Sequence, residues 1–317
     1  MLSLVVPCYN EEENVENFYA QTIYAFKNNI SEFEFVFVDD GSSDATLEKL
    51  HSLYDSDKKH VQVLSFSRNF GKEAAVYAGL SNAKGDYACI IDADLQQRPE
   101  VVIEMMNVID EDKTIDCVAA YQAKRKENKV MSAFKSSFYK IINRMAEVDF
   151  VNGASDFRLM NRKMIDAVIN MGEYHRFSKG IFSFVGFNTK YIPYEVQERE
   201  NGTSKWNFIK LSKYAIEGII SFSSLPLKLS AYVGFFSSFV SVLYLLLVII
   251  KRLAFGVDVP GYASIVVLLL FLGGLQLMGL GIVGTYLSKV YDQVKNRPVY
   301  ILKEHLNTDE EKQNDYK

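Results

Sequence analysis

Two carboxylates one residue apart, Asp92 and Asp94, follow a short apolar run near residue 90. The run, Tyr87–Ile91, comes directly after a Gly-Asp pair and predicts a buried strand. In an open α/β sheet, ligands bind at the carboxyl ends of the strands. Two carboxylates at such an end, with the side-chain amide of Gln96, offer the oxygen ligands that Mg²⁺ or Mn²⁺ prefers, and such a cation shares its shell with a substrate's phosphates. An isolated Asp-x-Asp also fits a solvated turn that caps a helix, so its context has to decide.

Short apolar segments alternate with helical patterns over the first hundred residues. We expect strands at Leu2–Pro7, Glu34–Val38, Val61–Phe66 and Tyr87–Ile91, with helices from Asn10 to about Lys27, at Ala45–Tyr54 and at Glu73–Ala83. Asn10 with Glu13 resembles a capping box for the first helix, and Ser43 or Asp44 is the expected cap of the second. This alternation predicts a parallel, doubly wound sheet.

Three of the expected strands end in polar clusters: Tyr9-Asn10-Glu11, Asp39-Asp40 and Asp92-Ala93-Asp94. Because parallel strands end at the same edge, we expect these clusters to meet where a nucleotide would bind. The sequence contains neither GxGxxG nor GxxxxGK[ST], which argues against a dinucleotide cofactor and against a glycine-rich phosphate loop. The acidic clusters instead favour recognition of base and ribose together with metal-assisted binding of phosphate.

Composition narrows the class of protein. The net charge of −4 and the lack of a basic, aromatic-rich patch argue against a nucleic-acid-binding protein. Cys8, Cys89 and Cys117 are odd in number, widely spaced and embedded in apolar runs, so we expect reduced thiols in the core. The N-terminus has no basic segment followed by a long apolar core, and we expect no cleavable signal peptide.

The last third of the chain contains two long uncharged stretches. Leu229–Ile250 has 22 residues without a charge and Val259–Ser288 has 30. Each can cross a bilayer core of about 30 Å as a helix, although buried helices of a soluble protein remain the alternative. The short link between them would place both flanks on one side of a membrane. Two further stretches have an apolar stripe with basic flanks: Trp206–Ser224 predicts an amphipathic surface helix, and Lys129–Val148 predicts either another or a core helix. The tail, Lys303–Lys317, is polar, and we expect it to be disordered.

Five segments occur in a characteristic order: VPCYNEEENV, FVDDGSSDAT, GDYACIIDADLQ, NGASDFRLM and RENGTSKW, followed by the two apolar stretches. In this order they resemble the family 2 glycosyltransferases that act on polyprenyl phosphates. The chain is similar to dolichol-phosphate mannose synthases, and more so to bacterial bactoprenol-phosphate glucosyltransferases with two C-terminal transmembrane helices. The resemblance implies a Rossmann-like A-type glycosyltransferase domain with a mostly parallel sheet at residues 1–205 and an amphipathic helix at 206–227. Two transmembrane helices would follow within 228–290, at about 229–251 and 262–287, and then a cytosolic tail at 291–317.

The resemblance also implies a nucleotide-sugar site. Asp40 would accept a hydrogen bond from the N3–H of uracil, with Asp39 and Glu11 nearby, whereas a helix-capping turn is the alternative for this segment. Asp92, Asp94 and Gln96 would hold Mg²⁺ or Mn²⁺. Lys72 would reach the nucleotide, although a solvated lysine is an open alternative. The remaining nucleotide-sugar residues would be Pro7, Tyr9, Asp92 and Ala93.

Asp156 occupies the position at which the family has its catalytic base. A phosphate monoester acceptor has a second pKa of about 6 and is largely dianionic at neutral pH, so its oxygen needs little deprotonation. Asp156 would then orient the acceptor or stabilise the developing sugar cation as much as remove a proton. Its alternative role is a salt bridge with Arg158. The resemblance further assigns Arg199 and Lys205 to catalysis, and Arg158, Arg199, Ser204 and Lys205 to the acceptor phosphate.

These features together predict a bacterial membrane enzyme with its catalytic domain and both termini in the cytoplasm. It would transfer one hexose, glucose or N-acetylglucosamine, from a UDP-sugar to undecaprenyl phosphate with inversion, and so provide a lipid-linked sugar for modification of surface glycans such as lipopolysaccharide or teichoic acid. The transmembrane helices offer a surface for a homo-oligomer. Lys251 and Arg252 would lie in the outer loop, against the positive-inside tendency.

Three alternatives remain open. One is a mannose synthase that uses GDP-mannose and acts on the same kind of lipid. Another is a processive polysaccharide synthase, which normally has more membrane spans and a QxxRW-like motif. The last is a non-catalytic module that recruits partners to the membrane.

Overall fold

Eight strands form one sheet in the part of the chain that the structure describes, residues 1–122, 154–195, 220, 223–255 and 261–307 of a computed structural model. The strands are β1 (Leu2–Cys8), β2 (Phe33–Asp39), β3 (Val61–Phe66), β4 (Tyr87–Ile90), β5 (Cys117–Gln122), β6 (Ala154–Asn161), β7 (Thr189–Tyr194) and β8 (Leu302–Leu306). Their order is β7-β5-β6-β4-β1-β2-β3-β8. The four strands expected from the sequence are present, and they pair in parallel as β4-β1-β2-β3. β6 pairs antiparallel with β4 and β5, and β8 pairs antiparallel with β3, so the sheet is mixed.

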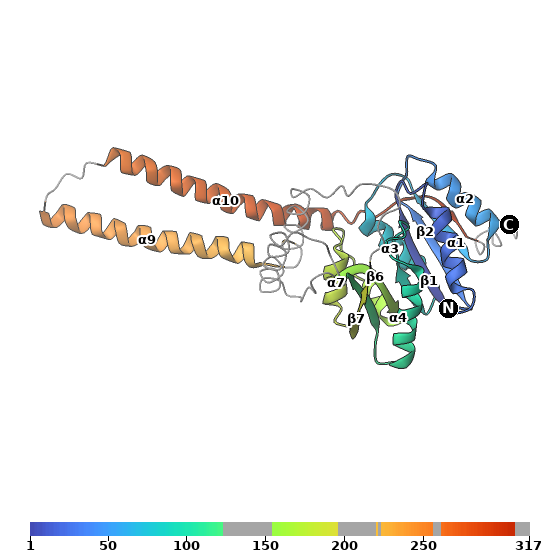
Figure 1. Cartoon of the computed structure of the whole chain (residues 1–317). Helices are drawn as coiled ribbons and strands as arrows, with labels where there is room; N and C mark the ends of the chain where they lie inside the picture. Colours follow the sequence, from blue (N-terminus) through green and yellow to red (C-terminus); the bar gives the residue numbers. More distant parts are fainter. Residues whose placement is uncertain (123–153, 196–219, 221–222, 256–260, 308–317) are drawn as a thin grey trace.

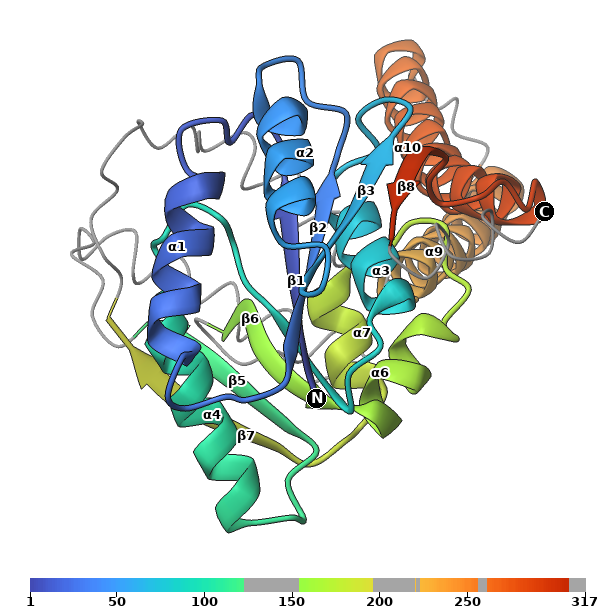
Figure 2. The same cartoon turned by 90° about the vertical axis from the view of Figure 1, so that its right-hand side faces the viewer.

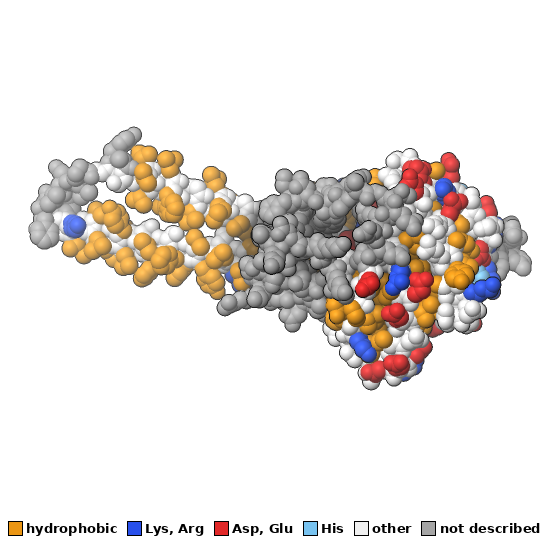
Figure 3. Space-filling model, in the orientation of Figure 1, with side chains coloured by type: hydrophobic (Ala, Val, Ile, Leu, Met, Phe, Trp, Pro, Cys, Tyr) orange, Lys and Arg blue, Asp and Glu red, His pale blue; other side chains and the backbone are white. Residues whose placement is uncertain are grey.

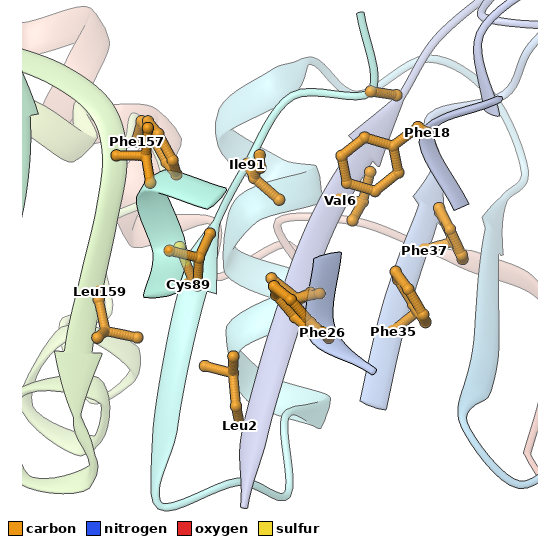
Figure 4. Packing of buried hydrophobic residues seen from close by; sticks show 14 of the residues in the cluster. Leu2, Val6, Phe18, Phe26, Phe35, Phe37, Cys89, Ile91, Phe157 and Leu159 are labelled. Atoms are coloured by element: carbon orange, nitrogen blue, oxygen red, sulfur yellow. The ribbon is translucent and has the colours of Figure 1, made fainter. Parts of the chain in front are cut away.

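Helices cover both faces of this sheet (Figure 2). On one face lie α1 (Val15–Phe26), α2 (Thr46–Ser56) and α4 (Pro99–Glu111), and on the other lie α3 (Lys72–Asn82), α6 (Arg162–Ile169) and α7 (Ser178–Phe184). Successive strand residues point to opposite faces, and Leu4 and Val6 accordingly pack into the first core while Val5 packs into the second. In the first core, Phe18 of α1 meets Phe37 of β2 edge to face at 6.4 Å (Figure 4).

The three cysteines lie in these cores as free, buried thiols, as expected. Burial raises the pKa of Cys8, Cys89 and Cys117. A thiol whose pKa is raised is poorly reactive, because the thiolate is the nucleophile.

The expected cap at Asn10 is wrong. The first helix begins at Val15, five residues later, and Asn10 has a left-handed backbone with φ of 55°. Its side-chain oxygen accepts a hydrogen bond from the backbone N–H of Ser43 at 2.9 Å. Asn10 therefore ties the loop after β1 to the loop after β2. The N-cap of the second helix is Ala45 and neither Ser43 nor Asp44, so that expectation is also wrong, although the Asp44 carboxylate accepts from the backbone N–H of Thr46 at 3.0 Å.

The prediction of a disordered tail is wrong for its first residues. β8 runs beside β3 with Leu64 opposite His305 and Val63 opposite Leu306. Just before it, the ring of Tyr300 stacks on Phe66 at 5.0 Å, with 15° between the ring planes. The segment after the second apolar helix thus returns to the sheet and belongs to the first domain, instead of forming a separate tail.

Two long apolar helices, α9 (Leu225–Phe255) and α10 (Tyr262–Val294), extend side by side from the sheet domain (Figure 1). The stretches Leu225–Lys251 and Ser264–Val294 have mean hydropathies of 2.5 and 2.4 and are not buried inside the protein. Hydrophobic side chains spread over the surface of both helices (Figure 3). Exposed apolar surface of this extent is unfavourable in water and indicates association with a membrane.

Both helices are longer than the expected 229–251 and 262–287. The amphipathic segments predicted at Lys129–Val148 and Trp206–Ser224 lie outside the described residues, apart from single positions at the end of the second.

Candidate active site

Acidic side chains from β4 and β6 converge at one edge of the sheet. Asp92 lies two residues after the end of β4, and Asp156 lies near the beginning of the antiparallel β6. Ile90 pairs with Arg158 in the sheet, and Asp92 and Asp156 each lie two residues beyond this pair, towards the same edge. The reversed direction of β6 therefore places the start of that strand at the carboxyl edge of its parallel neighbours, as the expected site requires.

The loop after β4 folds back so that Gln97 forms hydrogen bonds with Asp92. The side-chain oxygen of Gln97 accepts from the backbone N–H of Asp92 at 3.0 Å, and its amide nitrogen donates to the Asp92 carboxylate at 3.2 Å. Asp94 accepts from the backbone N–H of Gln96 at 3.2 Å, and Leu95 between them has a φ of 58°. A bulky residue in this left-handed conformation is strained, and such strain concentrates at functional sites.

Gln97 was not among the residues expected from the sequence. It is buried, and it holds Asp92 at both the backbone and the side chain. Its contact depends on the left-handed turn at Leu95, which no sequence pattern indicated.

Lys72 lies among the acids. Its ammonium nitrogen is 2.5 Å from an oxygen of Asp92, and the lysine side chain is 46% exposed to solvent. Contact of Lys72 with a nucleotide stays a prediction. Partial burial alone would lower the pKa of Lys72, but the nearby charges of Asp92, Asp156 and Asp94 outweigh it and raise that pKa. The site thus holds one fixed positive charge within reach of three carboxylates.

Asp40 and Asp39 are buried and bonded inside the protein. Asp40 accepts from the backbone N–H groups of Phe70, at 2.6 Å, and Gly71, at 2.9 Å. Burial raises the pKa of Asp40, although these two hydrogen bonds act in the opposite direction. Asp39 accepts from Ser42 and Ser65. Contact of Asp40 with a uracil stays a prediction, and the structure gives this carboxylate the additional task of fixing the loop before α3.

Asp156 and Arg158 do not form the salt bridge that was their alternative role, within the contacts of the described residues. One oxygen of Asp156 is buried without a hydrogen-bond partner, and so is Nε of Arg158. The Arg158 guanidinium donates to the carbonyl of Ser155 at 3.0 Å and lies 3.8 Å from the ring centre of Phe182. A buried polar atom without a partner is costly, and its presence in a folded protein requires an explanation.

Glu73 is a second residue that the sequence did not reveal. It follows Lys72 in the first turn of α3, and its carboxylate accepts from both the backbone N–H, at 2.9 Å, and the hydroxyl of Ser178. Burial and the charge of Asp156 raise the pKa of Glu73. Ser178 begins α7, so Glu73 satisfies an N–H group at the start of that helix.

The remaining expected residues are only partly brought together. Pro7 lies on β1, Tyr9 is exposed just beyond it, and Ala93 is buried in the loop after β4. Glu11 is bonded by the side chain of Asn14 at 2.6 Å. Arg199, Ser204 and Lys205 lie outside the residues that the structure describes.

The donor set at the β4 end suits a hard divalent cation. No group of three or more His, Cys, Asp or Glu side chains that could hold a metal occurs in the described ranges. Asp92, Asp94 and Gln96 offer oxygen atoms only, and a cation there would complete its shell with phosphate oxygens of a ligand. These residue types are the ones that Mg²⁺ or Mn²⁺ prefers, and in the structure the Asp92 carboxylate is bonded to Lys72 and Gln97.

The mixed sheet, covered by helices on both faces and with acids at its carboxyl edge, defines an α/β domain of the kind that binds its ligand at strand ends. Residues 3–169 match the family described as glycosyl transferase family 2, and the chain belongs to that family.

Relatives extend the similarity over most of the chain. A bactoprenol glucosyl transferase of Shigella phage SfII is 42% identical over 304 residues, which cover 95% of this chain and 97% of the relative. A prophage bactoprenol glucosyl transferase homolog of Escherichia coli K12 is 40% identical over 304 residues. The alignment covers 95% of this chain and 98% of the relative.

Among solved structures, a glucosyl-3-phosphoglycerate synthase from Mycobacterium tuberculosis, in complex with Mg²⁺ and uridine-diphosphate, aligns with a TM-score of 0.48 and 15% identity. The alignment covers 69% of this chain and 77% of that one.

Proposed function

We propose that this protein transfers a single glucose from UDP-glucose to undecaprenyl phosphate at the cytoplasmic face of a bacterial membrane. One observation carries the proposal: Lys72, Asp92 and Asp156 meet at one sheet edge in a chain with two helices long and apolar enough to span a membrane. The names of the relatives support the sugar and the lipid. The lipid-linked glucose would then serve modification of cell-surface glycans.

The reaction is a single displacement at the anomeric carbon. An oxygen of the acceptor phosphate forms the new bond, the bond to the diphosphate breaks, and UDP leaves with the electron pair, so that the configuration inverts. Lys72 is the fixed cation of the described site that can face the diphosphate. A divalent cation held by Asp92, Asp94 and Gln96 would neutralise the charge that develops on UDP.

Asp156 would act mainly through its charge and position. The acceptor phosphate is already largely dianionic at neutral pH, because its second pKa is about 6. Removal of a proton contributes little to such a nucleophile, whereas a carboxylate beside the anomeric carbon stabilises positive charge that develops on the sugar. The buried, unpartnered oxygen of Asp156 supports this role. Arg158, Arg199, Ser204 and Lys205 would bind the acceptor phosphate.

The experiment uses purified protein, undecaprenyl phosphate in vesicles and a panel of UDP-glucose, UDP-N-acetylglucosamine and GDP-mannose. Mass spectrometry of the lipid should show undecaprenyl phosphate plus one hexose with UDP-glucose, and EDTA should abolish that product. A product from GDP-mannose alone would support the mannose-synthase alternative. The absence of any product with all three donors would favour the non-catalytic alternative.

A further inference from the structure

The end of α10 next to the sheet domain is bonded to a loop of that domain. The side chain of Gln293 accepts from the backbone N–H of Tyr174 at 2.8 Å and donates to the carbonyl of Gly172 at 2.7 Å. One residue before it, Asp292 pairs with the His175 ring at 3.0 Å. We call these five residues the α10 junction. A glutamine that uses both ends of its amide on one loop fixes that loop in position as well as in orientation.

The loop continues from the α10 junction towards the active site. The guanidinium of Arg176 donates to the carbonyls of Met171 and Val168 and lies 4.3 Å from the ring centre of Tyr77, a residue of α3. Two residues later, Ser178 is held by Glu73 in the first turn of α3. The segment is therefore bonded to the long apolar helix at one end and to the neighbour of Lys72 at the other.

The same segment leads to the acceptor side of the site. α7 begins at Ser178, and Phe182, one turn later, packs against the guanidinium of Arg158. Arg158 is 5% exposed and lies two residues from Asp156 on the same strand. A shift of α7 would therefore move Phe182, the ring that packs against Arg158.

The chain that follows α10 makes a second attachment to the sheet domain. The chain after α10 packs Tyr300 on Phe66, and the backbone N–H of Ser67 donates to the carbonyl of Ile301 at 3.0 Å before β8 joins the sheet. The two attachments, one at residues 292–293 and one at residues 300–301, both restrain the end of α10 relative to the domain.

The length of α10 leaves this end outside a bilayer core. Its 33 residues span about 50 Å at about 1.5 Å per residue, whereas the hydrocarbon core is about 30 Å thick. The charged residues Lys289 and Asp292 occur at the end that carries the α10 junction. One continuous helix therefore connects the membrane to the loop before α7.

We infer that the α10 junction positions the active site relative to the membrane, so that the phosphate of a bilayer-embedded lipid acceptor reaches Asp156 and Arg158. Asp292 and Gln293 are positioning residues in this view and do not touch the substrate. The inference rests on the proposed transfer to a lipid phosphate. It predicts that the junction matters for an acceptor held in the membrane and not for one that diffuses freely.

The test compares two acceptors on the full-length protein in vesicles. One is undecaprenyl phosphate in the bilayer, and the other is a short, water-soluble prenyl phosphate. Gln293→Ala should lower kcat/KM at least about tenfold for the bilayer acceptor and less than about twofold for the soluble one, because small misplacements of reacting groups are costly. Gln21→Ala, which changes an exposed glutamine of α1, serves as the matched control.

Equal losses with both acceptors, or no loss with either, would overturn the inference. Asp292→Ala removes the partly exposed pair with His175 and the 3.9 Å ion pair with Lys295, and it repeats the comparison if Gln293→Ala does not fold. Failure of the wild-type protein to glycosylate either acceptor would instead refute the proposed function, so the two failures are distinguishable.

Discussion

At the scale of single residues, Asp40 links the loop after β2 to the start of α3. Its carboxylate accepts hydrogen bonds from the backbone N–H groups of Phe70 and Gly71, the two residues that precede Lys72. Gly41 beside it has a φ of 66°, and a Cβ there would lie 2.5 Å from the carbonyl carbon of Arg68. The two loops can approach this closely only because residue 41 is glycine. Asp40 and Gly41 thereby set the position from which Lys72 reaches Asp92.

Replacement of Asp40 tests this linkage. Asp40→Ala leaves two N–H groups without an acceptor and should lower the free energy of unfolding by about 1–3 kcal/mol, even without nucleotide. Asp40→Asn keeps an oxygen acceptor and should recover much of that loss. Thermal unfolding of the nucleotide-free variants measures the effect, with Asp55→Ala on the exposed side of α2 as control. An unchanged unfolding temperature for Asp40→Ala would show that the contact to the loop is dispensable.

The sequence indicated the acidic residues at the end of β4, but not the residues that form hydrogen bonds around them. Asp92 and Asp94 follow an apolar run, a local pattern that sequence shows directly. Glu73, in contrast, acts through Ser178, 105 residues away, and only the packing of α7 against α3 brings them together. Gln97 and Gln96 are adjacent and alike in type, so composition cannot tell which one turns back to Asp92.

At the scale of elements, β8 completes the sheet beside β3. A bare edge strand exposes unpaired N–H and C=O groups that invite association with other chains. β8 covers this edge, and Tyr300 anchors it through its contacts with Phe66 and Tyr77. The sequence LKEHL is too polar and too short to predict a strand by itself. It forms one because the edge of β3 offers partners, which is a tertiary effect.

Removal of the Tyr300 ring should loosen this attachment. Tyr300→Ala loses a stacked and an edge-on aromatic contact and should destabilise the protein by about 2 kcal/mol. Tyr24→Ala, at an exposed position of α1, should change stability little. Denaturant unfolding of both variants in detergent gives the comparison. Equal stability of the two would mean that β8 is held by its backbone pairing alone.

At the scale of the whole molecule, the parallel core and the two apolar helices were predictable, and the placement of β6 was not. Apolar runs and uncharged stretches are properties of continuous sequence. β6 is inserted antiparallel between β4 and β5, after a long intervening segment, and no local pattern fixes the direction of a strand. The prediction that Asp156 belongs to the site therefore rested on the resemblance to a family and not on periodicity.

The orientation of the protein in a membrane can be tested by labelling introduced cysteines, because its three native thiols are buried and should not react. We expect the sheet domain in the cytoplasm, where nucleotide sugars are available, and the loop between α9 and α10 outside. That arrangement places Lys251 beyond the membrane, against the usual preference for positive charge inside. If the protein uses a nucleotide sugar as proposed, we expect the need for a cytoplasmic donor to outweigh this preference, because a domain outside the cell would have no substrate.

A membrane-impermeant maleimide reports which side each segment occupies. The wild-type protein should stay unlabelled while it is folded, because Cys8, Cys89 and Cys117 are buried and their pKa values are raised by burial. Asp258→Cys, between the two apolar stretches, should react in intact cells. Gln21→Cys, in the exposed part of α1, should react only after the membrane is opened. Labelling of Gln21→Cys in intact cells would place the active site outside, and a cytoplasmic UDP-sugar would then no longer be a possible donor.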